Sequence, residues 1–233
     1  MGSEDYRWKI VRNDTGSAGF LLLNVFFIAT LQPVLLFLIT TPTYVLLLTL
    51  RLASSAEYGE NVPTWLTADL ISSRALLAFV LLAYYADQQQ WQYHQAKQYY
   101  QKTAKVPPKY KREDLERGFN TSGLWAWSRH PNFFAEQAFW LTIYQWDCRV
   151  TRTIFNWTGV GALSYLLLFQ ASTLLTERIT AGKYPEYADY QRKVGKFIPG
   201  LGKSYKRPLT KDATTDGTVK VDTRSQRNKR KNV

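Results

Sequence analysis

The sequence has a single cysteine, comparatively few acidic residues and a long stretch without any charge. Cys148 alone excludes an intrachain disulfide and a cysteine-based zinc site. The 18 acidic residues stand against 30 Lys and Arg, and the net charge of +12 alone would suggest nucleic acid or an anionic membrane surface as partner. Residues 16–50, however, carry no charge and are dense in Leu, Phe, Val and Ile. As a helix they would extend about 52 Å, beyond the roughly 30 Å hydrocarbon core of a bilayer, which favours an integral membrane protein that binds no nucleic acid.

Apolar and polar segments alternate along the chain and predict an all-α, multispan bundle of about four transmembrane helices. The apolar segments cover residues 17–50, 70–85, 133–146 and 153–176. Pro33 and Pro42 predict that the first is bent, because proline removes a backbone donor and kinks a helix. We expect a polar, aromatic-rich loop over residues 87–130. We further expect a membrane domain over residues 1–200 and a disordered basic tail over residues 201–233, where Lys, Thr, Asp and Asn prevail.

The distribution of positive charge predicts how the chain sits in the membrane. Lys and Arg are concentrated in residues 87–130 and in the tail, whereas residues 51–69 are net negative. The positive-inside rule therefore predicts that both termini and the large polar loop face the cytosol. The final K-R-K-N-V resembles the dilysine retrieval signal of endoplasmic reticulum membrane proteins, which predicts that membrane as the location. The basic tail would also hold anionic membrane lipid, at about 1 kcal/mol per residue near the surface.

The most informative motif for chemistry is GLWAWSRHPNFFAE, residues 123–136. Pro131 suits the first position of a helix, which places Arg129 and His130 at the helix N-terminus. A helix N-terminus beside an arginine favours the binding of a phosphate or carboxylate. The alternative is that both side chains only reach the membrane interface.

Two polar residues of the same motif share one face of that helix. Asn132 and Glu136 are four positions apart, about one turn inside the membrane. An ionisable residue at that depth is costly and indicates a functional site. The alternative is that Glu136 pairs with a cation on a neighbouring helix.

Two further polar groups converge on the same predicted cytosolic face. Asp87 ends the second apolar segment, and Glu177 with Arg178 ends the last, with Tyr187 and Tyr190 beyond. We interpret all five as candidate cofactor-binding residues. The alternatives are a polar helix end at Asp87 and a solvated ion pair, worth about 0–1 kcal/mol, at Glu177 and Arg178.

These motifs resemble a known family. S-R-H-P-N-F-F-A-E at 128–136 is similar to the S-R-H-P-N-Y-F-G-E signature of the DUF1295 group of steroid 5-alpha-reductase-like proteins. A-D-Q-Q-Q-W-Q-Y at 86–93 is similar to the A-D-x-Q-K-W-x-F of that group, and L-L-T-E-R at 174–178 with Y-A-D-Y at 187–190 resembles its C-terminal ending. The resemblance covers about residues 2–200.

The resemblance implies an NADPH-dependent membrane reductase of a carbon–carbon double bond in a lipid-like or secondary-metabolite substrate. It implies that Asn132 and Glu136 hold the nicotinamide side and that Asp87 binds on the adenosine side. The cations near the phosphates would be Arg129, His130 and Arg178. The G-S-E-D-Y-R-W at 2–8 is similar to an internal segment of fungal members, whose upstream spans shape the substrate pocket. The chain would then be the cofactor-binding half, with a partner chain supplying upstream helices, and the catalytic residue stays open.

Departures from the family pattern leave two other interpretations open. Phe133 and Ala135 replace Tyr and Gly of the signature, and His94 stands where relatives often carry Arg, so that Lys97 would have to supply the phosphate contact. An S-adenosylmethionine-dependent enzyme like the isoprenylcysteine carboxyl methyltransferases shares an R-H-P-x-Y motif, although Asn132 favours the reductase. An inactive membrane fragment acting as a scaffold is the second alternative.

Overall fold

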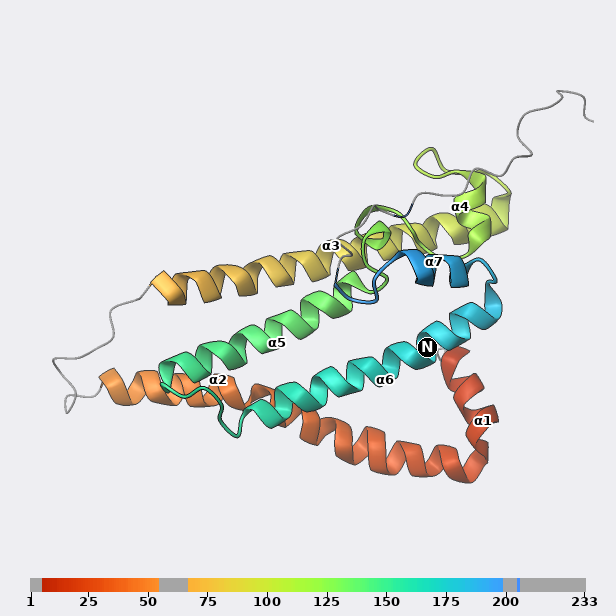
Figure 1. Ribbon diagram of the computed structural model, residues 1–233. Coiled ribbons are helices and arrows are strands. Elements are labelled where there is room, and N and C mark those ends of the chain that lie inside the picture. Colours follow the sequence, from red (N-terminus) through yellow and green to blue (C-terminus); the bar gives the residue numbers. More distant parts are fainter. Residues whose placement is uncertain (1–5, 55–66, 199–204, 206–233) are drawn as a thin grey trace, which may run out of the picture.

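The computed structural model describes residues 6–54, 67–198 and 205, and within these residues it is helical (Figure 1). The elements are α1 (Tyr6–Leu22), η1 (Leu23–Leu31), α2 (Gln32–Ser54), α3 (Thr67–Thr103), α4 (Arg112–Arg117), η3 (Gly123–Ala126), α5 (Pro131–Val150), α6 (Gly159–Lys183) and α7 (Tyr187–Lys193). The only β pairing in this part of the chain is an isolated bridge between Ser128 and Gly195. The predicted all-α bundle is confirmed, whereas the predicted disordered tail lies outside the described residues.

Three helical segments of the described chain are long and apolar enough to cross a membrane. They cover Trp8–Thr49, Asp69–Thr103 and Gly159–Lys183. About four spans were predicted, and three segments of the described chain have the length and apolarity of a span. The fourth segment, α5, has 20 residues and the length for a crossing at 1.5 Å per residue, but its sequence is interrupted by Glu136, Asp147 and Arg149.

The first apolar segment bends, but its sharpest kink does not lie at a proline. Gly16 has φ 69° and ψ 173°, a conformation that glycine adopts without steric cost, and α1 folds back there toward the end of α6 (Figure 1). A π-helical stretch then precedes Pro33, with the Gln32 N–H bonded to the Phe27 carbonyl five residues earlier. Pro42 lies inside α2. Bends were predicted at Pro33 and Pro42, whereas the kink at Gly16 was not predicted.

The predicted loop over residues 87–130 is wrong for its first third. The helix α3 continues from the apolar segment to Thr103, a total of 37 residues. Between residues 87 and 103 the chain holds Ala, Gln and Lys, which favour helix, and neither Gly nor Pro. The polar half of α3 packs its buried Tyr93 and Ala96 against Leu115 of α4.

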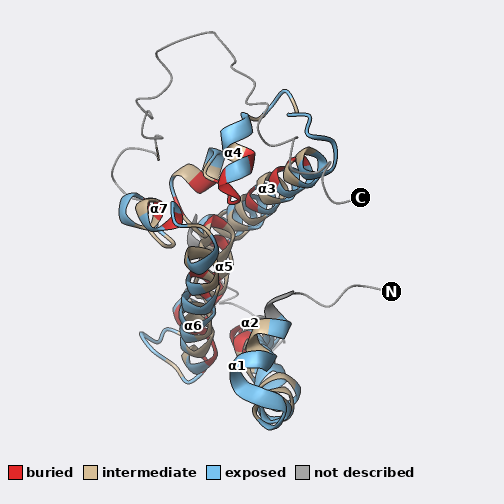
Figure 2. Cartoon of the chain, turned by 90° about the vertical axis from the view of Figure 1, so that its right-hand side faces the viewer, coloured by how far each residue is buried: buried red, intermediate tan, exposed pale blue. Residues whose placement is uncertain are grey.

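The polar cap, which we define as residues 104–130 and 184–198, closes one end of the bundle. Figure 2 shows buried residues gathered where α4 and α7 meet the other helices, while α1 and much of α2 are exposed. The centre of this cap is a hydrophobic cluster of three aromatic residues, Phe119, Tyr187 and Tyr190, with Val194. Such a cluster gives the cap a hydrophobic core outside the apolar spans.

Helices α2 and α6 approach each other closely through small residues. A Cβ added at Gly161 would lie 2.3 Å from the carbonyl oxygen of Leu38, so that no side chain fits there. Ala162 and Ile39 are buried at the same contact, 4% and 2% exposed. Small residues of this kind let helix backbones pack in membranes, where lipid removes the hydrophobic driving force.

We expect Gly161→Val to destabilise the bundle, because the added methyl groups must push α2 and α6 apart. Overpacking of a close contact costs about 1–3 kcal/mol. Thermal unfolding in detergent, followed by circular dichroism, should show a lower Tm. The control is Gly182→Ala in the same helix, where an added Cβ meets nothing within 4 Å. Equal Tm values for the two variants would contradict the close contact.

Candidate functional site

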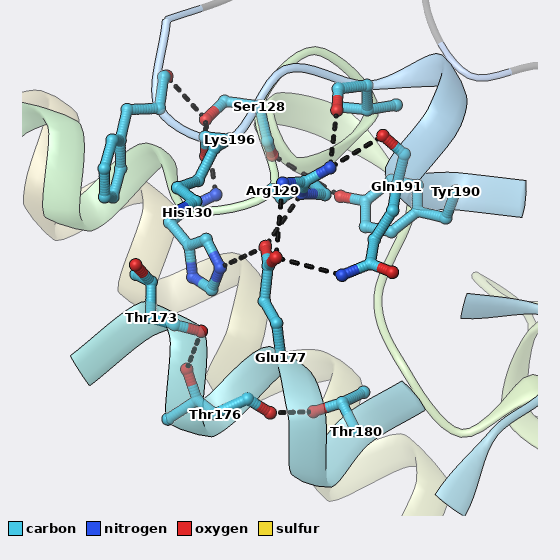
Figure 3. A network of polar contacts seen from close by, with 12 residues as sticks. Ser128, Arg129, His130, Thr173, Thr176, Glu177, Thr180, Tyr190, Gln191 and Lys196 are labelled. Atoms are coloured by element: carbon cyan, nitrogen blue, oxygen red, sulfur yellow. Dashed lines mark hydrogen bonds and ion pairs between the residues drawn. The ribbon is translucent and has the colours of Figure 1, made fainter. Parts of the chain in front are cut away.

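A buried carboxylate joins three separate segments of the chain at the inner face of the polar cap (Figure 3). Glu177 of α6 is 6% exposed. Its two oxygens accept from Arg129 Nε at 2.8 Å and Nη2 at 3.2 Å, a bidentate geometry. His130 Nε2 lies 2.9 Å from Glu177 Oε1, and Gln191 Nε2 donates to Oε2 at 3.0 Å. We call these four residues the Glu177 cluster.

The rest of the Arg129 side chain holds the C-terminal part of the polar cap. Its Nη1 donates to the Gln191 carbonyl at 2.7 Å, and its backbone N–H donates to the Gly195 carbonyl at 2.9 Å. The neighbouring Ser128 hydroxyl donates to the Phe197 carbonyl at 2.7 Å. All three guanidinium nitrogens thus contact protein groups, and the described arrangement uses Arg129 as a connector between segments.

The two candidate tyrosines lie inside the polar cap. Tyr187 and Tyr190 are 5% and 1% exposed and pack on Phe119. The Tyr190 hydroxyl donates to the Trp125 carbonyl, and burial raises the pKa of Tyr190 above its ordinary value. These residues build the core that positions the cap.

A groove with a volume of about 820 Å³ lies between the polar half of α3, the polar cap and the end of α6. Its lining residues are Gln90, His94, Lys97, Gln98, Tyr100, Gln101, Leu115, Glu116, Gly118, Phe119, Thr176, Ile179, Thr180, Lys183 and Tyr184. The groove is rich in hydrogen-bonding groups and has lysines on both of its long walls. Its volume falls within the roughly 300–1,000 Å³ of small-molecule sites.

The position of Lys97 in the groove is set by neutral partners. Its Nζ donates to the Gly118 carbonyl and to the Tyr184 hydroxyl, each at 2.9 Å. Partial burial alone would raise the pKa of Tyr184, but the adjacent ammonium outweighs it and lowers the pKa. Gly118 has φ 87°, and a Cβ there would lie 2.1 Å from the Tyr184 ring, so that only glycine fits. No carboxylate is among the described partners of Lys97.

Asp87 and Asn132 are in direct contact. Asn132 Nδ2 donates to Asp87 Oδ1 at 2.9 Å, and because a carboxylate only accepts, this bond fixes the orientation of the amide. Asn132 Oδ1 is then a buried acceptor without a partner in the described chain. The resemblance implied that Asn132 binds on the nicotinamide side of a cofactor and Asp87 on its adenosine side, and the structure brings these two side chains into contact.

A second buried acceptor, Gln90 Oε1, lies on α3, three residues after Asp87. Gln90 Oε1 has no partner among the described residues, while Gln90 Nε2 lies 3.1 Å from His94 Nε2. A buried acceptor left unpaired costs about 1–3 kcal/mol. Because Gln90 lines the groove, its unpaired acceptor indicates that a donor from water or from a ligand belongs there.

Glu136 contacts neutral donors. Its Oε1 accepts from Trp140 Nε1 at 2.9 Å and from the Tyr165 hydroxyl at 3.1 Å. The alternative was that Glu136 pairs with a cation on a neighbouring helix, and its described contacts are the neutral Trp140 and Tyr165 instead. The sequence analysis missed Tyr165, which comes from α6.

Arg178 lies apart from the Glu177 cluster. Successive helical residues point in different directions, and Arg178 is exposed. With Ile10 and Asp14 of α1 it lines a different cavity of about 430 Å³. The structure therefore separates Arg178 from Arg129 and His130, with which it was grouped as a phosphate-binding cation.

The sequence analysis also missed several groove residues, although a signal was present. Gln90, His94, Lys97 and Gln101 follow Asp87 at spacings of three or four, which places them on one helix face. That spacing carries meaning only in a helix, and this segment was predicted as a loop.

The apolar spans and the polar cap define the class, an integral membrane protein with a helical bundle. The chain belongs to the family described as "Protein of unknown function (DUF1295)", which it matches over residues 1–194. It is similar to the "Uncharacterized protein C594.04c" of Schizosaccharomyces pombe, with 38% identity over 215 residues, 91% of this chain and 60% of that relative. The chain thus spans about 60% of the length of the curated relative it matches. No solved structure matches it.

We expect Glu177→Gln to loosen the polar cap, because Arg129 would lose the charge that compensates it. Breaking a buried ion pair from one side costs about 3–5 kcal/mol. The Tm in detergent should fall, and limited proteolysis should cut residues 191–198 sooner. The control is Glu116→Gln, which removes an ion pair with Arg112 whose side chains are 47% and 72% exposed. A Tm change no larger for Glu177→Gln than for this control would contradict the role of the cluster.

Proposed function

We propose that this chain forms the NADPH-binding half of a membrane reductase that acts on a carbon–carbon double bond in a lipid-like or secondary-metabolite substrate. The observation that supports it most is the groove, which is lined by lysines on α3 and α6 and by Gln90, whose Oε1 is buried and has no partner among the described residues. Asn132 matches the S-R-H-P-N of the family signature, whereas Gln90 stands where the A-D-x-Q-K-W-x-F pattern has Lys, so the motif supports the assignment of Asn132.

The unpaired acceptors fit the polar end of a nicotinamide. The carboxamide of a nicotinamide carries two N–H donors. Gln90 Oε1 and Asn132 Oδ1 each lack a donor of this kind. Glu136, one turn inside α5 from Asn132, would lie toward the bilayer side of that group. NADPH would supply a hydride, and the residues of this chain would bind and orient it.

The charge of the groove fits the phosphates of the same cofactor. Lys97 and Lys183 line it together with His94, and the only acidic lining residue, Glu116, is 2.7 Å from Arg112. A lysine binds a phosphate oxygen as a point charge. S-adenosylmethionine is itself cationic at sulfur, so a positively charged groove favours the dinucleotide over the methyltransferase alternative.

The substrate half would come from helices outside this site. The Schizosaccharomyces pombe relative is longer than the region it shares with this chain. We propose that further helices, from a longer protein or from a partner chain, complete a pocket for a lipophilic substrate within the membrane. We also propose the endoplasmic reticulum as the location and a cytosolic polar cap, where soluble NADPH is available.

We expect NADPH to raise the Tm of the purified protein in detergent, by more than NADH or S-adenosylmethionine do. A ligand at 100 times its Kd stabilises by about 2.7 kcal/mol. Asn132→Ala should weaken NADPH binding about 10-fold or more, because it removes an acceptor worth about 1–3 kcal/mol. The control is Gln145→Ala, an exposed amide on the same helix. Stabilisation by S-adenosylmethionine alone would favour the methyltransferase, and no shift with any cofactor would contradict a folded cofactor site.

A further inference from the structure

A smaller pocket lies on the neighbouring face of α3, against the polar cap. Its volume is about 260 Å³. Its lining residues are Gln89, Tyr93, Lys109, Tyr110, Asp114, Arg117, Phe119, Asn120, Thr121, Ser122 and Gly123. Of these only Phe119 also lines the groove, so the small pocket is a separate space.

One lining residue of the small pocket, Asn120, carries a buried donor that has no partner in the described chain. Asn120 is 3% exposed. Its Oδ1 accepts from the Ser122 N–H at 3.0 Å and from the Ser122 hydroxyl at 2.8 Å, and the N–H bond fixes which amide atom is the oxygen. Asn120 Nδ2 is therefore an orphaned donor within the described chain, and an acceptor is the group that would satisfy it.

The charge of the small pocket favours an anion. Its lining holds two cations, Lys109 and Arg117, against one acid, Asp114. Arg117 Nη2 lies 3.3 Å from that carboxylate and Arg117 Nε lies 3.5 Å from Glu186 Oε2, whereas Lys109 Nζ donates to the neutral Gln92 Oε1 at 2.5 Å. Lys109 is thus the lining cation without a carboxylate among its described contacts, and a single cation of this kind favours a monoanion.

The walls of the small pocket favour a flat molecule. Tyr93 and Tyr110 meet edge to face with centroids 6.1 Å apart, and Phe119 forms a further apolar surface. Aromatic walls pack well against another ring. A volume of about 260 Å³ holds one substituted ring and is too small for a dinucleotide.

We propose that the small pocket binds a planar aromatic monoanion, a carboxylate on a single ring. The carboxylate accepts from Asn120 Nδ2 and is attracted by Lys109, while the ring lies against the tyrosines. This site does not depend on the proposed reductase function, because neither Gln90 nor Asn132 lines the small pocket. The competing occupant is ordered water, which also satisfies buried donors in polar cavities.

The test uses the full chain in detergent and benzoate as the probe, with saturation-transfer NMR and isothermal titration as readouts. We expect benzoate to bind, and cyclohexanecarboxylate, which has the same charge but a puckered ring, to bind at least 5-fold more weakly. Asn120→Asp should weaken benzoate at least 10-fold, since it replaces the donor by a charged acceptor and keeps the acceptor for Ser122. The matched control is Gln98→Glu, which adds the same charge on α3 outside the small pocket and should leave the Kd unchanged.

Four results would overturn the proposal. The first is that benzoate does not bind to the native chain, which leaves water as the occupant. The second is an unchanged Kd for benzoate in Asn120→Asp. The others are equal binding of cyclohexanecarboxylate and release of benzoate by saturating NADPH. If Asn120→Asp fails to fold, Lys109→Gln decides the question, because Lys109 is exposed and its loss should weaken benzoate severalfold without lowering the Tm. Failure of NADPH to bind would reject the reductase function and leave this site standing.

Discussion

The polar end of the bundle depends on one buried carboxylate. Glu177 lies in α6, and its partners come from the segment before α5 and from α7, 47, 48 and 14 positions away in sequence. Removing a carboxylate from water is costly unless charge and hydrogen bonds compensate it, and both are supplied here by Arg129, His130 and Gln191. Because the same arginine also binds carbonyls of the C-terminal segment, the ion pair fixes the backbone of the polar cap as well as its side chains.

This arrangement determines which cations face the groove. Arg129 and His130 are both engaged by Glu177, and the charge of Arg129 is compensated inside the protein. Lys97, in contrast, contacts a carbonyl and a phenol, and its charge stays uncompensated within its described contacts. The lysines that line the groove are Lys97 on α3 and Lys183 on α6, and the S-R-H motif positions the wall of the cap. The charged residues of that motif therefore serve the fold.

The sequence predicted the elements that follow from apolar length and from local helix signals. The apolar runs, the helix beginning at Pro131 and the shared face of Asn132 and Glu136 depend on nearby residues only. The second half of α3 was not predicted, because the charge at Asp87 was taken as the end of a helix. Charge ends a membrane span, but it does not end a helix, which continues in water as long as its residues favour it.

Contacts between distant segments could not be predicted from the sequence for a different reason. Nothing near Glu177 shows whether it pairs with the adjacent Arg178 or with Arg129, since the choice depends on how α6 is rotated against the polar cap. The rotation is set by packing: Gly161 must face α2, because a side chain there would meet the Leu38 backbone. Sixteen residues further along the same helix, that constraint turns Glu177 toward the cap and Arg178 away from it. The glycine contact at one end of α6 and the ion pair at the other are therefore two consequences of a single helix orientation.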